Sequence, residues 1–205
     1  MASEATSGEP SVRRATWADR FTMADVFAAA FRDDPLFQWM TATSTGLQAR
    51  SRPYFLSITK IHLARSGDEL FVTADGGGAA LWCAPDRWKV SVVDLARSTS
   101  GSLRTFRLHG VRALRALAAM ERSHPAETHY YLQYLGTRPE LQGKGIGSAL
   151  MTPMLDRCDA EGLPVYLESS ERAIAFYARH GFVERERIAF PRGCPPTQPM
   201  WRDPR

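Results

Sequence analysis

Hydrophobic positions recur with two different periods along the chain. Over residues 17–31 they repeat every three or four residues, which predicts an amphipathic helix. The same spacing predicts a second helix over 50–65, where Pro53 suits the first turn. It also predicts a helical segment over 90–120 that is broken near 98–102.

Short apolar runs bounded by turn residues separate these helices and predict strands. The expected strands are residues 11–16, 69–74, 79–83, 128–136 and 163–168, with a weak last strand after Phe190. Residues 75–78 form a tight turn that joins the second and third strands into a hairpin. This alternation predicts one mixed α/β (α+β) domain over 11–205, preceded by a disordered tail at 1–10.

A glycine-rich turn lies between the strand at 128–136 and the helix that follows it. Residues 141–150 read Leu-Gln-Gly-Lys-Gly-Ile-Gly-Ser-Ala-Leu, so glycines occupy alternate positions. Without Cβ atoms, the backbone takes unusual conformations and a ligand approaches its N–H groups closely. The first N–H groups of a helix have no internal partner and carry partial positive charge. We therefore expect the turn to bind an anion, most simply a phosphate.

Two other interpretations of the turn stay open. One is a connection that binds nothing. The other is a dinucleotide-binding fingerprint, for which Gly143 and Gly145 fit and Glu168 lies at a suitable distance to hold a ribose. Against the fingerprint, Ser148 occupies the third glycine position, and residues 137–142 separate the strand from the turn. A Walker loop is excluded because the sequence contains no G-x-x-x-x-G-K-[ST].

The pattern Gln142-x-x-Gly145-x-Gly147 after a strand resembles the acyl-CoA pyrophosphate loop of the GCN5-related N-acetyltransferases (GNAT family). Residues 163–168 resemble that family's next strand, and 175–182 resemble its F-Y-x-x-x-G-F helix end. The stretch 127–205 is most similar to puromycin N-acetyltransferase-like small-molecule enzymes. This resemblance implies a GNAT fold, with a mixed, mostly antiparallel sheet that is flanked by helices and splayed at the cofactor strand.

The resemblance also implies site residues and acetyl-CoA as the co-substrate. Tyr177 would contact the cofactor and act as the general acid toward the departing sulfur. The strand segment Leu135, Gly136 and Thr137 would pair with the pantetheine arm, and an amide near Leu135 would stabilise the oxyanion. The pyrophosphate would lie on Gln142, Gly143, Lys144, Gly145, Ile146, Gly147 and Ser148.

The general base stays open. Many family members carry a glutamate on the central strand, but Gln133 occupies a plausible place here and does not titrate. His129 and Glu168 are the main candidates, and Glu127 is a third. A sufficiently neutral amine would need no strong base. At the position of Ala173, close relatives often carry an asparagine that contacts the cofactor. This chain therefore lacks one expected polar contact with the cofactor.

The composition limits the kinds of partner that the protein is expected to bind. The net charge is +4, but the sequence contains no run of basic residues interleaved with aromatic ones. This argues against binding to nucleic acid. Cys83, Cys158 and Cys194 form no C-x-x-C pair, so neither a disulfide framework nor a metal site is expected. No apolar run is long enough for a membrane span, and we expect a cytoplasmic monomer or homodimer.

These observations predict an N-acetyltransferase that acetylates a small-molecule amine, for example an antibiotic, by direct attack in a ternary complex. The aromatic residues at 31–40 favour a closed acceptor pocket, although they also suit a buried helix corner. His62 stands alone on an apolar face and is expected to be structural. The alternatives are acetylation of a protein N-terminus or lysine, and a CoA-binding module without catalysis.

Overall fold

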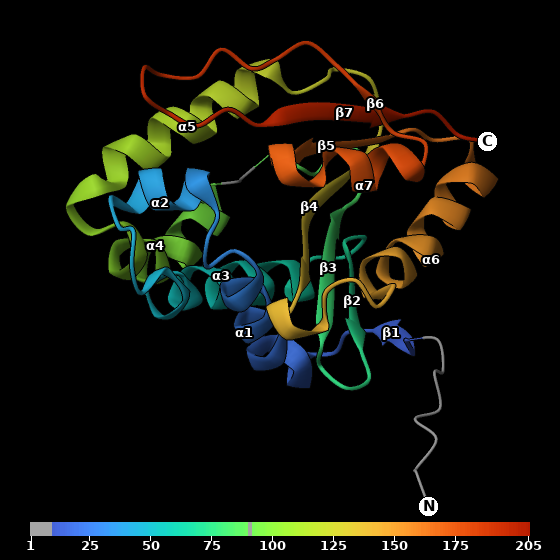
Figure 1. Ribbon diagram of the computed structural model, residues 1–205, viewed down its shortest axis with the longest axis horizontal. Coiled ribbons are helices and arrows are strands. Elements are labelled where there is room, and N and C mark those ends of the chain that lie inside the picture. The colour runs from blue at the N-terminus through green and yellow to red at the C-terminus, as the bar shows by residue number, and fades with distance from the viewer. Residues whose placement is uncertain (1–9, 90–91) are drawn as a thin grey trace, which may run out of the picture.

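The computed structural model describes residues 10–89 and 92–205, and places seven strands in one sheet (Figure 1). Their order is β1-β2-β3-β4-β5-β7-β6, and only the β4–β5 pair is parallel. The strands are β1 (Val12–Arg14), β2 (Glu69–Thr73), β3 (Gly78–Cys83), β4 (Tyr130–Thr137), β5 (Val165–Ser169), β6 (Val183–Glu184) and β7 (Gln198–Arg202). The mixed, mostly antiparallel sheet agrees with the predicted fold class. All but the last residue of the expected tail at 1–10 lies outside the described residues.

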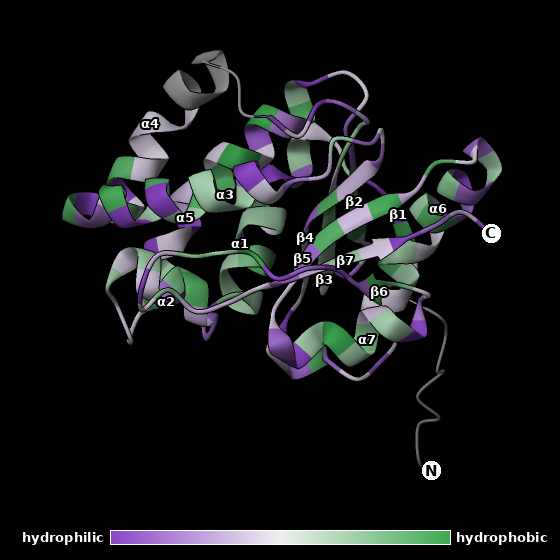
Figure 2. Ribbon diagram, turned by 90° about the horizontal axis from the view of Figure 1, so that it is seen from above, coloured by the Kyte–Doolittle hydropathy of each residue, from purple (hydrophilic) through white to green (hydrophobic). Residues whose placement is uncertain are grey.

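Helices cover both faces of the sheet (Figure 1). They are η1 (Trp17–Asp19), α1 (Arg20–Ala30), α2 (Pro35–Thr41), α3 (Leu47–Ala64), α4 (Val92–Phe106), η2 (Arg107–His109), α5 (Gly110–Ser123), η3 (Pro139–Leu141), α6 (Ile146–Glu161), η4 (Glu171–Ala173) and α7 (Ile174–Arg179). Helix α5 combines hydrophobic and polar positions in the manner of an amphipathic helix (Figure 2). None of the helices in the described ranges is both long and apolar enough to cross a membrane.

The two-residue period of β3 divides the core into two clusters. Leu81 and Cys83 pack with α1 and α3 on one face, whereas Ala80 and Trp82 pack with α6 on the other. Trp82 is fully buried there. Its side chain therefore belongs to the core and does not line the cavity described below.

The sheet opens between β4 and β5. These strands pair only at Tyr130↔Val165 and Tyr131↔Tyr166 in the described structure. On the other edge of β4, the register against β3 shifts so that Gln133 is an extra residue, which makes a β-bulge. A bulge increases the local twist and bends the strand. The predicted splay at the cofactor strand is therefore present, and it begins directly after Tyr131.

Two expected helix boundaries were wrong. The break in the inserted helical segment lies at Arg107–His109 and not near 98–102. Arg107 has a φ of +48°, which a continuing helix does not allow. Gly101 stays helical because α3 packs closely there: an added Cβ would lie 2.5 Å from the Pro53 carbonyl oxygen. The second helix begins at Leu47, so Pro53 lies in its interior instead of its first turn.

Candidate active site

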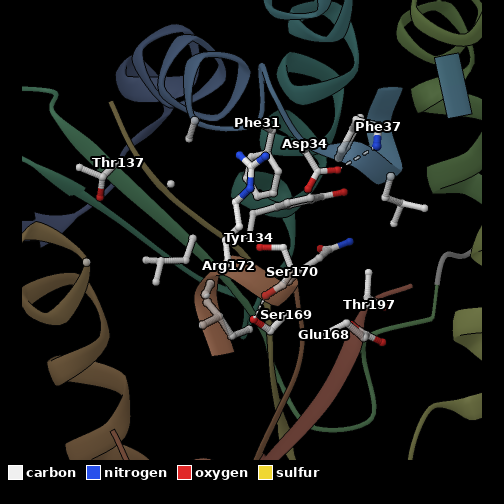
Figure 3. Close-up of a pocket in the computed structure, with 18 of the residues that line it drawn as sticks. Phe31, Asp34, Phe37, Tyr134, Thr137, Glu168, Ser169, Ser170, Arg172 and Thr197 are labelled. Carbon is white, nitrogen blue, oxygen red and sulfur yellow. Dashed lines mark hydrogen bonds between the residues drawn. The ribbon is translucent and has the colours of Figure 1, made fainter. Parts of the chain in front are cut away.

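A cavity of about 1130 Å³ lies at the opening between β4 and β5. One part of its wall is the glycine turn, the β4 edge and α7. The opposite part comes from the α1–α2 corner, α3 and α5, with Phe31, Asp34, Phe37, Tyr54 and Leu117. Figure 3 shows Glu168 and Asp34 on different elements that border the same space. The cavity therefore joins the predicted cofactor residues to an aromatic chamber built by the first half of the chain.

The glycine turn has the backbone that anion binding requires. Gly143 and Gly145 have φ values of +77° and +79°, which L residues with side chains rarely adopt. Helix α6 then begins at Ile146, and no side chain caps its first N–H groups. The backbone of this helix start borders the cavity, so its free donors and the positive end of the helix dipole are available to an anion.

Gly147 has a different role from the two glycines before it. A Cβ at Gly147 would lie 3.1 Å from the ring of Phe176, so its absence lets α7 pack against α6. The neighbouring Ser148 hydroxyl lies 3.1 Å from His180 Nε2, and His180 Nδ1 lies 2.9 Å from the Phe176 carbonyl oxygen. These contacts fix α7 to the turn, and Tyr177 with it.

Most predicted cofactor residues line the cavity. They are Leu135, Gly136, Thr137, Gln142, Gly143, Gly145, Ile146, Gly147, Ser148 and Tyr177. Lys144 is exposed and does not line it, so the structure leaves this lysine outside the set. The residues of β4 beyond Tyr131 have no partner strand on the β5 side within the described chain, which leaves an edge for an extended amide-bearing arm.

Tyr177 lies in α7 at the cavity wall. Burial raises the pKa of its hydroxyl above the ordinary value near 10. The phenol is therefore protonated at neutral pH, as a proton donor must be. Its ring packs edge-on against both Phe176 and Phe182, which orients the hydroxyl. Ala173 also lines the cavity, where its methyl group offers no polar contact.

Glu168 on β5 is a buried carboxylate that also lines the cavity. Its Oε2 accepts a hydrogen bond of 2.7 Å from the Tyr131 hydroxyl. Its Oε1 is buried without a hydrogen-bond partner, and lies 3.8 Å from His124 Nδ1. This oxygen can therefore accept a hydrogen bond from a donor that enters the cavity.

His129 is buried behind this site and does not line the cavity. Its Nδ1 donates to the Glu127 carbonyl oxygen, and its Nε2 lies 3.0 Å from His124 Nε2. Burial lowers the pKa of its imidazole, which keeps the ring neutral. His129 therefore does not border the cavity itself, and Glu127, which is exposed, does not line it either.

No motif in the sequence marks His124, Trp88 or Asp34 as a site residue. Trp88 lines the cavity and stacks on His124 with 3.6 Å between ring centroids. Asp34 caps α2 by accepting from the Phe37 N–H at 2.8 Å, and burial raises the pKa of its carboxyl. His124 precedes Pro125 and looked like the end of a helix, and no motif spacing connects it to Glu168.

His62 is held by Asp68, as its predicted structural role requires. Its Nδ1 lies 2.8 Å from Asp68 Oδ2, and the Ala84 N–H donates to Asp68 Oδ1 at 3.0 Å. These two residues and Cys83 could together offer three atoms to a metal ion. The hydrogen bonds already use them, however, and Arg65 lies 3.8 Å from Asp68 and adds a positive charge there.

The comparisons with known proteins agree with this geometry. Residues 102–182 match the model of the acetyltransferase (GNAT) family. An uncharacterized N-acetyltransferase of Schizosaccharomyces pombe is 28% identical over 193 residues, which cover 85% of this chain and 76% of that protein. A Corynebacterium glutamicum structure, described as histone acetyltransferase HPA2 and related acetyltransferase, is 29% identical, with a TM-score of 0.72 over 97% of this chain and 98% of that one.

A more distant structure shares the fold. The PaiA N-acetyltransferase of Thermoplasma acidophilum, solved in complex with coenzyme A, has a TM-score of 0.57 at 14% identity, over 96% of this chain and 99% of that one. A splayed mixed sheet with an uncapped glycine turn beside the opening defines an acyl-CoA-dependent acyltransferase. The family model, the S. pombe relative and the Corynebacterium structure together support a GNAT acetyltransferase, as the resemblance of the motifs predicted.

Proposed function

We propose that this enzyme transfers the acetyl group of acetyl-CoA to the amine of a small molecule, by direct attack in a ternary complex. The observation that carries the proposal is one continuous cavity with the glycine turn and the β4 edge on one side, and Glu168 among aromatic walls on the other. Both substrates fit into such a space at once, which direct transfer requires.

The cofactor half of the cavity offers backbone hydrogen-bonding groups to the pyrophosphate, the pantetheine arm and the thioester of acetyl-CoA. The free amides from Gly143 to Ser148 hold the pyrophosphate, and the edge of Leu135, Gly136 and Thr137 pairs with the pantetheine amides. Acetyl-CoA supplies an activated acyl group as a thioester. A backbone N–H near Leu135 then stabilises the negative charge that develops on the carbonyl oxygen.

Glu168 and Tyr177 divide the proton transfers between them. Glu168 Oε1, which lacks a hydrogen-bond partner, takes a proton from the acceptor ammonium and leaves a neutral amine that attacks. The Tyr177 hydroxyl gives its proton to the departing sulfur, and the phenolate then takes the second proton that the nitrogen loses. The balance is one proton released for each amide formed.

The acceptor side favours a cationic amine with an apolar or aromatic body. Phe31, Phe37 and Tyr54 supply aromatic surface, and the Asp34 carboxylate adds negative charge in the same chamber. The Arg172 side chain extends toward Phe31 and Asp34 and narrows this end (Figure 3). An antibiotic amine belongs to this class. The name of the Corynebacterium neighbour supports a protein lysine as the second candidate acceptor.

The test is an assay of free CoA thiol with acetyl-CoA and a panel of aromatic amines, polyamines, aminoglycosides and lysine peptides. We expect turnover with a small amine and little with peptides. Turnover confined to peptides would identify a protein acetyltransferase instead. A melting temperature that rises with acetyl-CoA, without turnover on any acceptor, would identify a CoA-binding module.

A further inference from the structure

A row of hydrogen bonds behind Glu168 fixes where the protons on two buried histidines lie. His129 Nδ1 faces the Glu127 carbonyl oxygen, which only accepts, so this nitrogen carries a hydrogen. In neutral His129 the Nε2 atom is then an acceptor, and His124 Nε2, 3.0 Å away, must donate to it. The neutral His124 ring is left with a bare lone pair on Nδ1.

That lone pair faces a carboxylate oxygen. His124 Nδ1 lies 3.8 Å from Glu168 Oε1, the oxygen without a hydrogen-bond partner. Two acceptors that face each other in a buried site are unfavourable. One added proton resolves the conflict, whether it lies on Glu168 Oε1 or on His124 Nδ1, because either atom then donates toward the other.

His124 is fixed in the position that this sharing requires. Its side chain is 3% exposed, and Trp88 stacks on it from the cavity side at 3.6 Å between centroids. Tyr131 and Tyr166 meet it with their edges. The ring therefore has little freedom to turn Nδ1 away from Glu168.

The other titratable groups that face the pair are Tyr131, Tyr166, Cys83, His129 and Glu127. Burial raises the pKa of the two tyrosines and of the Cys83 thiol, so these three stay neutral. Burial lowers the pKa of His129, so the added proton is better placed on Glu168 or His124. Glu127 is exposed and its charge is screened by water.

We propose that Glu168 and His124 act as one proton-accepting pair, in which His124 is a positioning residue that increases the affinity of Glu168 for the proton of the acceptor ammonium. This inference rests on the proposed function. The N–H bond of the acceptor ammonium breaks, and the proton joins Glu168 Oε1 or passes on to His124 Nδ1. After the product has left, this proton is released to water through the cavity. No oxidant, metal or further reactant is needed for these steps.

The decisive variant is His124→Asn, whose amide can donate to Glu168 but does not accept a proton. We expect kcat/KM for the amine to fall by about 10–100-fold, within the usual range for acid–base catalysis, while KM for acetyl-CoA is unchanged. The low-pH limb of the kcat/KM profile should move to lower pH because the amide donor stabilises the charged carboxylate. His109→Gln, on the far η2 turn, is the matched histidine control.

A double variant separates this role from a structural one. Glu168→Gln alone should abolish most activity, and His124→Asn should then cause no further loss, because residues that act as a unit are not additive. The pairing would be overturned if His124→Asn lowered kcat/KM equally in the wild type and in Glu168→Gln. It would also be overturned if His124→Asn left the low-pH limb of the kcat/KM profile unchanged. If the wild-type enzyme binds acetyl-CoA but acetylates nothing, the proposed function fails instead.

A readout without catalysis completes the test. Long-range ¹⁵N NMR of the imidazoles should show His129 with its hydrogen on Nδ1, and the neutral form of His124 with its hydrogen on Nε2. Glu168→Gln should change the titration of His124 and leave that of His109 as it was. A neutral His124 with its hydrogen on Nδ1 would contradict the proton arrangement even in an inactive protein.

Discussion

At the scale of single residues, removal of the Tyr177 hydroxyl tests the proposed reaction most directly. Tyr177→Phe removes one oxygen and keeps the ring contacts with Phe176 and Phe182. We expect kcat to fall by about 10²–10⁴-fold because the sulfur loses its proton donor. Acetyl-CoA should still raise the melting temperature as in the wild type. Full turnover with the preferred amine would remove Tyr177 from the mechanism.

The charge of Asp34 can be tested without disturbing the helix that it caps. Asparagine is as good an N-cap as aspartate, so Asp34→Asn keeps the bond to the Phe37 N–H. We expect KM for a cationic amine to rise several-fold, while KM for acetyl-CoA and the melting temperature stay the same. An uncharged amine analogue is the internal control, since its KM should not respond. If both acceptors respond equally, Asp34 acts through shape and not through charge.

At the scale of elements, sequence motifs could predict a cofactor side of the site because its chemistry depends on neighbouring positions. Residues 141–150 combine the turn, its backbone donors and the helix start in ten consecutive residues. The proposed pairing of the candidate base Glu168 with His124 could not be predicted in this way. Glu168 and His124 come from different elements, and only the parallel pairing of β4 with β5 and the stacking of Trp88 bring them together.

The two ends of α6 provide a matched pair of substitutions. Gly145 and Gly162 flank the helix with φ values of +79° and +66°, and a Cβ at either would meet nothing within 4 Å. Alanine therefore adds backbone strain of about 1–2 kcal/mol at each position without a clash. Both variants should melt a few degrees lower. Only Gly145→Ala should also weaken the binding of acetyl-CoA, which calorimetry measures. If the two variants bind acetyl-CoA with equal affinity, the glycine turn has a structural role only.

At the scale of the whole molecule, the period of the apolar residues predicted the mixed sheet and most of the element order, but not α2 or β6. It did not predict the cavity, one side of which is made by α1, α2, α3 and α5 meeting the open edge of β4. Helix boundaries were also missed where tertiary packing decided them. Gly101 looks like a helix breaker in sequence, but it stays helical because α3 lies against it.

The last strand is tied to both helices of the cofactor side by Arg202. This buried guanidinium on β7 makes two bonds of 2.7 Å to the Asp159 carboxylate on α6, and its Nε donates to the His180 carbonyl oxygen beyond α7 at 3.0 Å. These bonds lower the pKa of Asp159 below its usual value. A carboxyl whose folded pKa is depressed stabilises the fold above its unfolded pKa, near 3.9, and loses that contribution as the pH falls through the folded value.

We therefore expect Asp159→Asn to lower the free energy of unfolding at pH 7 by about 1–3 kcal/mol, because it leaves a buried arginine without its charged partner. Denaturant unfolding at a series of pH values checks this. The difference from the wild type should be constant above pH 5 and should shrink as the wild-type carboxyl is protonated. Asp156→Asn, one turn earlier on α6, is the control for a lost surface charge. A difference that persists undiminished in acid would mean that Asp159 stabilises the enzyme by packing instead of by its ion pair with Arg202.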